Sequence, residues 1–395
     1  MGEASQDNRF TPVEEDAWIM DESGHEFMLR IFRDMPDPRV DRTRDHSLHD
    51  ILVIAVCAVL AGLEHWTQIA DYGQANQEWF GTFLDLPNGI PSHDTFGRVF
   101  AALDPDEFEK RLQRWVHAVA GSSAGKHIAI DGKTLRRSFD RASQKAAIHM
   151  VNAYVHENHA VFAQVKVDEK SNEITAVPKL LAMLQVKDAT VTFDALHCQK
   201  TISEKVVDKG GHYVMVLKGN QPTLQADVQW ALADARDRGW PGEHDTYACT
   251  EKGHGRIERR RCWTLGDVTW LQERHGWPGL QSVALIERER TVEGRTSREE
   301  CLVISSLPGR CAQRIAQVVR NHWRVENELH WTLDVAFNED ACRIRVENAA
   351  ENLSRVRRIG LMLLKQEKTA KMGIKSKRAK CGYQREYLFK VLGIA

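Results

Sequence analysis

The sequence lacks the features that would assign it to several specialised classes of protein. Its longest apolar run, residues 51–63, is too short to cross a bilayer, and its first residues lack the basic and then apolar pattern of a secretion signal. The eight cysteines include no C-x-x-C pair, so neither a zinc knuckle nor a disulfide framework is indicated. We therefore expect a cytoplasmic protein with reduced cysteines and no membrane partner.

An excess of one charge is also missing, because 54 lysines and arginines nearly balance 55 aspartates and glutamates. This balance argues against indiscriminate binding of polyanions. The charges are nevertheless unevenly distributed, since residues 1–29 form an acidic segment and residues 369–395 form a basic tail. The tail is suited to a phosphate backbone, although a solvated helix face explains it equally well.

The chain is long enough, at 395 residues, for two or three domains. Residues 30–122 have a mostly helical pattern, and the serine-capped helix predicted after the turn at residues 86–91 resembles a helix-turn-helix. Such a helical domain could bind DNA or could serve only for packing. From Lys126 onward, short β-type runs alternate with helical segments, and residues 245–309 form a β-rich insertion. This order predicts an α/β protein whose mixed sheet carries helices on its faces.

Two of the β-type runs end in a single aspartate, at Asp131 and Asp194. A carboxylate at the end of a buried strand is costly to desolvate unless a cation or donor meets it, so the pair suggests a shared metal site. A long helical pattern at about residues 312–337 holds a third acid, Glu326, on one stripe with His322 and His330. Three carboxylates suit Mg²⁺, with Mn²⁺ as an alternative, and two such ions can promote phosphodiester cleavage without a protein nucleophile. Zinc is disfavoured, because no H-E-x-x-H motif or cysteine pair accompanies the histidines.

Basic residues near these acids are candidates for DNA contacts. Three follow the first aspartate: Lys133, Arg136 and Arg137. They either contact phosphates near the scissile bond or are ordinary exposed loop charges. Three more belong to the densest basic run of the insertion: Arg256, Arg259 and Arg261. Because side chains alternate along a strand, only part of this second run can face DNA.

Several short motifs occur in a fixed order from about residue 30 to beyond residue 330. They are Asp37-Pro38-Arg39, Ile90-Pro91-Ser92-His93-Asp94-Thr95-Phe96, Ala129-Ile130-Asp131-Gly132-Lys133-Thr134, Phe193-Asp194-Ala195, His254-Gly255-Arg256-Ile257-Glu258, His322-Trp323-Arg324-Val325-Glu326-Asn327 and Leu333-Asp334-Val335. In this order the sequence resembles the ISAs1 group of bacterial insertion-sequence transposases, also called H-repeat-associated proteins, within the DDE transposases. Each motif alone is weak, but the constellation is specific.

The resemblance implies an α/β fold with an RNase H-like, mixed-sheet catalytic core at residues 123–368. In such a core the first aspartate lies on the first strand and the second on the neighbouring fourth strand, positions that Asp131 and Asp194 fit. The third member should be a glutamate on a helix that follows a β-rich insertion. Glu326, after the insertion at residues 245–309, fits that position.

The sequence also departs from the pattern around this glutamate. Related transposases surround it with a Tyr, Arg, Glu and Lys signature, whereas Val319, His322 and Leu333 stand here in place of the Tyr, Arg and Lys. A competing alignment places Arg324 and Glu328 at the Arg and Glu of this signature. It leaves Glu328 as the alternative third acid.

The activity that the resemblance implies is metal-dependent cleavage of double-stranded DNA at the terminal inverted repeats of an insertion sequence, followed by strand transfer into target DNA. Asp131, Asp194 and Glu326 would be the catalytic, metal-binding residues. Holding two DNA ends normally needs a homodimer or a higher assembly. Two other functions remain open: an RNase H-like nuclease without strand transfer, and a domesticated DNA-binding relic.

Overall fold

The computed structural model describes residues 32–140, 144–168, 171–253 and 255–393. The acidic segment predicted at residues 1–29 lies outside them. The described chain begins with a helical layer made of η2 (Asp41–Thr43), α2 (Leu48–Leu60), α3 (Trp66–Ala75), α4 (Gln77–Phe80), α5 (His93–Ala102) and α6 (Pro105–Ala120). Helix α2 is apolar around its circumference and almost entirely buried, so it forms the centre of this layer. Ser92 caps α5 as predicted, because its Oγ accepts the N–H of Thr95.

The described part of the chain then builds a nine-stranded mixed sheet. Its strands are β1 (His127–Thr134), β2 (His149–Val155), β3 (Ala160–Lys166), β4 (Thr190–Phe193), β5 (His212–Leu217), β6 (His244–Gly253), β7 (Arg256–Leu265), β8 (Ser282–Val292) and β9 (Arg295–Ser305). The spatial order is β3-β2-β1-β4-β5-β9-β8-β7-β6. Strands β1 to β3 are antiparallel, whereas β4 and β5 run parallel to β1. This arrangement confirms the α/β fold with an RNase H-like core and places the fourth strand beside the first.

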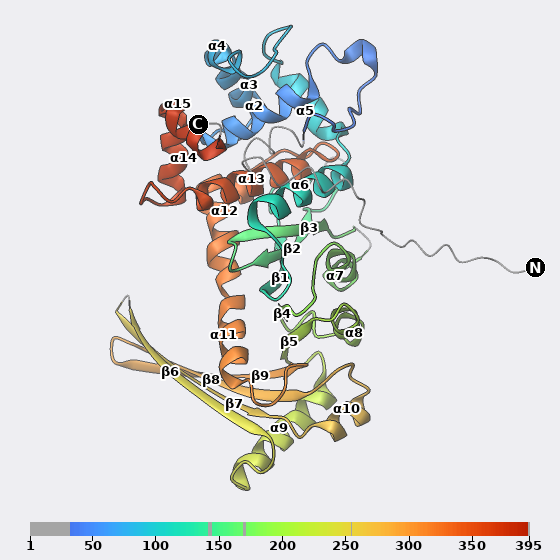
Figure 1. Cartoon of the computed structure of the whole chain (residues 1–395), viewed down its shortest axis with the longest axis vertical. Coiled ribbons are helices and arrows are strands. Elements are labelled where there is room, and N and C mark those ends of the chain that lie inside the picture. The colour runs from blue at the N-terminus through green and yellow to red at the C-terminus, as the bar shows by residue number, and fades with distance from the viewer. Residues whose placement is uncertain (1–31, 141–143, 169–170, 254, 394–395) are drawn as a thin grey trace, which may run out of the picture.

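The predicted β-rich insertion contains β6 to β9 and the short helix α10 (Thr269–His275). Its last strand, β9, pairs antiparallel with β5, so the insertion continues the core sheet instead of forming a separate layer. Figure 1 shows the β6–β9 strands extending beyond the core as long arms. The insertion is therefore joined to the catalytic core by a continuous hydrogen-bonded ladder.

Helices α7 (Glu173–Ala182), α8 (Lys200–Asp208) and α9 (Pro222–Asp237) alternate with the central strands. The helix predicted at residues 312–337 is present but interrupted. It consists of α11 (Ala312–His322), the wide π-helical turn η3 (Glu326–His330) and α12 (Trp331–Phe337). An apolar stripe of this helical segment faces the core, because Val325, Leu329 and Leu333 are all buried.

The chain ends with η4 (Glu339–Ala341), α13 (Ala349–Gln366), α14 (Ile374–Tyr383) and α15 (Arg385–Leu392). Helix α13 lies between the N-terminal helices and the sheet (Figure 1). Within α14, Lys377 and Arg378 are buried, and they donate to the backbone carbonyls of Leu364 and Val59. Part of the positive charge near the C-terminus therefore makes internal contacts. No helix among the described residues is long and apolar enough to cross a membrane.

Candidate active site

The sheet brings the two predicted aspartates to the same edge. Strands β1 and β4 are parallel neighbours, and their register pairs Ile130 with Phe193, so Asp131 and Asp194 each stand one residue further on. Burial, together with the nearby charges of Asp194 and Glu173, raises the pKa of Asp131 to about 7, against the lowering effect of the hydrogen bond from the Gly132 N–H. A divalent cation would offset this concentration of negative charge.

Asp194 is held by a buried histidine three residues further along the chain. The Nδ1 atom of His197 lies 2.8 Å from Asp194 Oδ1, and its Nε2 atom lies 2.9 Å from Glu173 Oε2. Burial alone would lower the pKa of His197, but its two carboxylate partners outweigh burial and raise the pKa to about 9. The imidazolium therefore neutralises part of the charge at this edge of the sheet.

Glu173, at the start of α7, was not among the predicted site residues. Its Oε1 atom lies 2.7 Å from His149 Nε2 on β2, and burial of the carboxylate is outweighed by its two histidine partners, which lower its pKa to about 2. Glu173 also explains the glycine after Asp131, because a Cβ at Gly132 would lie only 2.5 Å from Glu173 Oε2. The short spacing between Asp194 and His197 was the one local signal of this cluster in the sequence.

Glu326 lies at the beginning of the π-helical turn and approaches Asp131. His330 connects them, because its Nδ1 atom lies 3.1 Å from Glu326 Oε2 and 3.6 Å from Asp131 Oδ2. Ligand atoms of these three residues all lie within 4.8 Å of one another, which is compatible with one metal ion. Wide helical turns of this kind are rare and occur frequently at functional sites.

Glu328 points into a different set of contacts. Its carboxylate accepts hydrogen bonds from Tyr154 Oη at 2.8 Å and from Arg324 Nε at 2.7 Å. Burial of this carboxylate is outweighed by these partners and by His159, so its pKa is lowered to about 2. Glu326 is therefore the acid that faces Asp131, whereas Glu328 forms an ion pair with Arg324.

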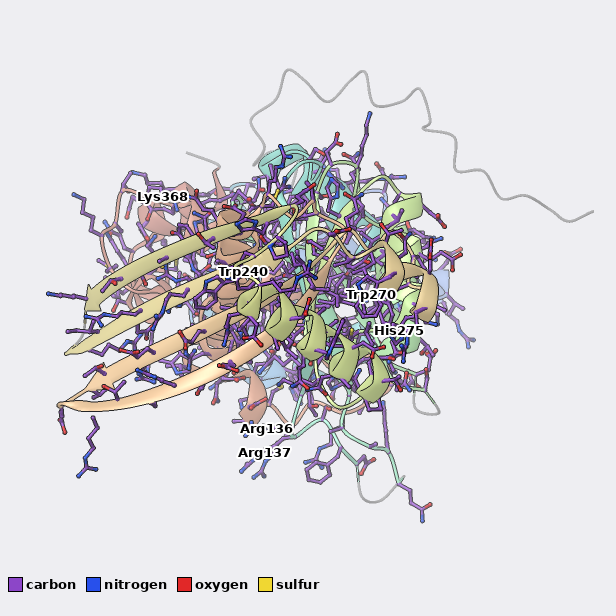
Figure 2. All side chains as sticks on the ribbon, turned by 90° about the horizontal axis from the view of Figure 1, so that it is seen from below. Arg136, Arg137, Trp240, Trp270, His275 and Lys368 are labelled. Carbon is purple, nitrogen blue, oxygen red and sulfur yellow. The ribbon has the colours of Figure 1, made fainter. Side chains whose placement is uncertain are left out.

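The three basic residues after Asp131 differ in their availability. Lys133 is buried, and its Nζ atom lies 2.7 Å from Asp334 Oδ1. Arg136 is exposed and forms an ion pair with Asp340 at 3.1 Å. Figure 2 shows Arg136 and Arg137 pointing outward from their loop. Only the two arginines therefore reach solvent without breaking a buried contact.

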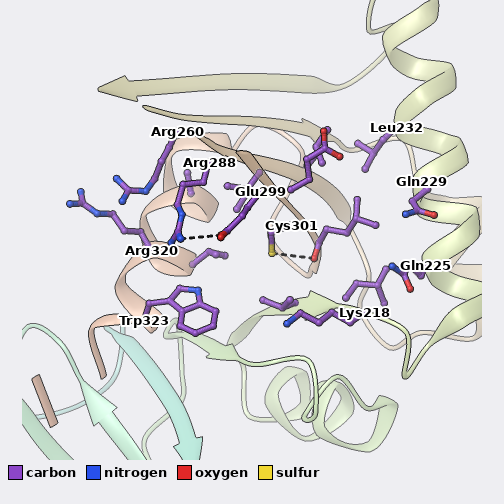
Figure 3. A pocket seen from close by; sticks show the side chains of 18 of the residues that line it. Lys218, Gln225, Gln229, Leu232, Arg260, Arg288, Glu299, Cys301, Arg320 and Trp323 are labelled. Carbon is purple, nitrogen blue, oxygen red and sulfur yellow. Dashed lines mark hydrogen bonds and ion pairs between the residues drawn. The ribbon is translucent and has the colours of Figure 1, made fainter. Parts of the chain in front are cut away.

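The arginines of β7 are divided between two faces of the sheet. Arg259 and Arg261 are paired with glutamates of β8, whereas Arg256 lies on the opposite face and pairs with Glu258. Two adjoining cavities lie on the face of Arg256. The first, of about 630 Å³, lies between the arms, α9 and α11, and the second, of about 860 Å³, lies between the arms and residues 320–327 and includes Arg256 in its lining. Their shared lining consists of Arg260, Arg288, Arg320 and Trp323 (Figure 3).

These cavities form an arginine-lined groove beside the helical segment that carries Glu326. The second cavity extends to Arg324 and Asn327, and Asn327 is the residue next to Glu326. Arg288 pairs with Glu299, and Arg320 pairs with Glu251. The cationic groups are thus partly compensated by glutamates, and an anionic ligand would have to compete with them.

Comparisons with known proteins show the family to which the chain belongs. Residues 122–363 match the family model described as Transposase DDE domain, and residues 29–116 match the DDE_Tnp_1-associated model. The "H repeat-associated putative transposase YhhI" of Escherichia coli strain K12 is 38% identical over 365 residues, which cover 91% of this chain and 95% of that protein. The "Putative transposase YncI" of Escherichia coli O157:H7 is 39% identical over 362 residues, covering 91% of this chain and 92% of that protein.

A solved structure of the piggyBac transposase synaptic complex with hairpin DNA is similar over 96% of this chain and 83% of that one, with 10% sequence identity and a TM-score of 0.47. The mixed sheet with two strand-end aspartates and a helical glutamate defines the class of the DDE transposases. By its family match and its relatives, this chain belongs to the Transposase DDE domain family and is similar to its H repeat-associated members.

Proposed function

We propose that the protein cleaves DNA at the terminal inverted repeats of an insertion sequence and transfers the freed 3′ ends into target DNA. The observation that carries this proposal is the meeting of Asp131 and Glu326 around His330, with Asp194 on the adjacent strand. The three carboxylates supply hard oxygen donors, which fit Mg²⁺ or Mn²⁺. When bound, such ions would activate the attacking oxygen and stabilise the leaving oxygen.

The residues of the chain supply the remaining requirements of this reaction. The backbones of Asp131 and Asp194 are positioned side by side by the adjacent strands β1 and β4. Burial of Asp131 keeps the local dielectric low, which strengthens its attraction for a cation. Lys133 supports Asp334 on α12 and so ties the first strand to the helix that follows Glu326.

We further propose that Arg136 and Arg137 contact DNA phosphates near the scissile bond, and that the groove containing Arg256 guides the strand toward the acids. Arg259 and Arg261 would contact only DNA that passes over the opposite face of β7. Double-stranded DNA is then the partner, and synapsis of two ends requires at least a homodimer. Access to chromosomal DNA would place the protein in the cytoplasm, at the nucleoid.

A cleavage assay tests this function. Wild-type protein, mixed with Mg²⁺ and a DNA fragment that carries the inverted repeat of the element, should release a defined 3′ end and join it to a target plasmid. Asp131→Ala, Asp194→Ala and Glu326→Ala should each abolish both products, whereas Glu328→Gln should retain them. Cleavage without joined product would favour the nuclease, and specific binding without cleavage would favour the relic. Unchanged products from Asp131→Ala would contradict the metal site itself.

A further inference from the structure

Two of the three proposed metal-binding side chains are exposed enough to move away from the site. The side chain of Asp194 is 44% exposed and that of Glu326 is 65% exposed, whereas that of Asp131 is 27% exposed. Asp131 accepts the backbone N–H of Gly132 at 2.9 Å, and Asp194 accepts that of His197 at a longer 3.3 Å. Mutual repulsion would drive free carboxylates apart before an ion arrives. The chain therefore needs contacts that hold Asp194 and Glu326 in place.

We propose that His197 and His330 are positioning residues, which hold Asp194 and Glu326 in the geometry that receives the metal. This inference rests on the proposed function, because it presupposes that the acids bind a divalent ion. Each histidine follows its acid closely along the chain, by three residues in one case and four in the other. Both imidazoles are buried, so each is itself fixed by its surroundings.

His330 has one nitrogen with partners and one without. Its Nδ1 atom faces the carboxylates of Glu326 and Asp131, whereas its Nε2 atom is buried and has no hydrogen-bond partner in the part of the chain that the structure describes. Since a carboxylate only accepts, Nδ1 must carry the proton and donate to Glu326. The wide turn η3 brings the two residues into this contact.

The unpartnered Nε2 atom of His330 helps to distinguish a positioning role from direct binding of the metal. A histidine that ligates a metal almost always donates its second ring N–H to an acceptor. Ligation through Nδ1 would move the proton of His330 to Nε2, where no acceptor is present among the described residues. A positioning role keeps the proton on Nδ1, where Glu326 accepts it, so this role explains the contacts of His330 better than ligation does.

His197 is supported from behind by a second chain of contacts. Its Nε2 atom lies 2.9 Å from Glu173 Oε2, and the other oxygen of Glu173 lies 2.7 Å from His149 Nε2. His149 in turn lies 2.7 Å from Thr134 Oγ1 through its Nδ1 atom. This series of side-chain contacts extends from Thr134, at the end of β1, to Asp194, just after β4. It therefore links the two strands that position the aspartates.

His322 provides a matched control. It lies four residues before Glu326, is buried like His330, and contacts Thr192 Oγ1 at 2.9 Å instead of an acid. Replacing it disturbs the same helix and the same core without touching the proposed ligands. Loss of packing and loss of positioning can therefore be told apart.

The experiment measures binding of Mn²⁺ to the full chain by electron paramagnetic resonance, without DNA, with folding checked by circular dichroism. His330→Ala and His197→Ala should each weaken binding by about tenfold or more, the range expected when a supporting contact of a metal ligand is lost. His330→Asn, which keeps a donor near the position of Nδ1, should recover most of the affinity. His322→Ala should stay within about threefold of wild type.

Several results would overturn the inference. It fails if His330→Ala and His197→Ala bind Mn²⁺ as wild type does, or if His322→Ala loses as much affinity as they do. It also fails if pulsed measurements detect nitrogen coupling to Mn²⁺ that disappears in His330→Ala, since His330 would then be a ligand. By contrast, Mn²⁺ binding that is absent from wild type, or unchanged in Asp131→Asn, would contradict the proposed function itself.

Discussion

Asp131 is the residue whose ionisation the fold alters most among the proposed metal-binding acids. Its pKa is raised from the ordinary value of 3.8 to about 7, first by burial and then by the charges of Asp194 and Glu173. In the folded, metal-free protein it therefore holds a proton that the unfolded chain has already lost. The contribution of Asp131 to stability is therefore fully present below about pH 4, falls as the pH rises to about 7, and levels off above that range.

The direction of this pH dependence leads to a prediction for Asp131→Asn, whose side chain cannot ionise. In EDTA, the free energy of unfolding of wild type should fall by about 2 to 3 kcal/mol more than that of the variant between pH 5 and pH 7. The variant should then be the more stable protein at pH 8. Urea denaturation at each pH measures the difference, and saturating Mg²⁺ should restore stability to wild type alone. Asp237→Asn, an exposed position, should follow wild type throughout.

The aspartates were predictable from the sequence, whereas the side chains around them were not. A single acid at the end of an apolar run is a local pattern, and Asp131 and Asp194 each show it. Glu173 meets His197 and His149 only because three separate elements converge. Contacts made through space leave no periodic trace in one sequence, so this part of the site required the structure.

At the scale of elements, local sequence patterns predicted where helices and strands lie, but not which strands pair with one another. The helical pattern predicted at about residues 312–337 covers α11 to α12, and Ser92 caps α5 as its position predicts. The pairing of β9 with β5 joins segments far apart in the chain and has no local signal. The wide turn η3 was also missed, because no proline or glycine marks it and its apolar stripe continues unbroken.

The alternation of side chains along β7 leads to a second prediction, which concerns the faces of the insertion. Replacing Arg256 and Arg288 with Gln removes two cations from the groove, and should weaken DNA binding for all sequences while lowering the slope of log affinity against log salt by about 2. Replacing Arg259 and Arg261 with Gln serves as the matched control on the opposite face. Fluorescence anisotropy over a series of salt concentrations measures both. A larger change in the control would assign DNA to the other face.

At the scale of the whole molecule, a buried ionic cluster joins the helical layer to the catalytic core. Glu109 on α6 lies 2.9 Å from Arg355 Nε and 2.5 Å from Arg358 Nη2, both on α13. It also accepts the backbone N–H of Gln164 on β3 at 2.9 Å. One carboxylate thus connects three elements, and the same apolar core runs continuously from α2 to α15.

We therefore expect the helical layer and the sheet to unfold together, and Glu109→Ala to be costly. Removing Glu109 takes the carboxylate partner from buried Arg358 and leaves Arg355 with Glu351 alone, and breaking a buried pair typically lowers the free energy of unfolding by about 3 to 5 kcal/mol. Glu107→Ala, on the same helix, removes a half-buried i to i+4 pair with Arg111 and a longer pair with Lys110 at 3.9 Å, and should cost about 1 kcal/mol or less. Urea titrations followed by tryptophan fluorescence and by circular dichroism should show one coincident transition. Separate transitions, or equal losses for the two variants, would mean that the cluster does not couple the layers.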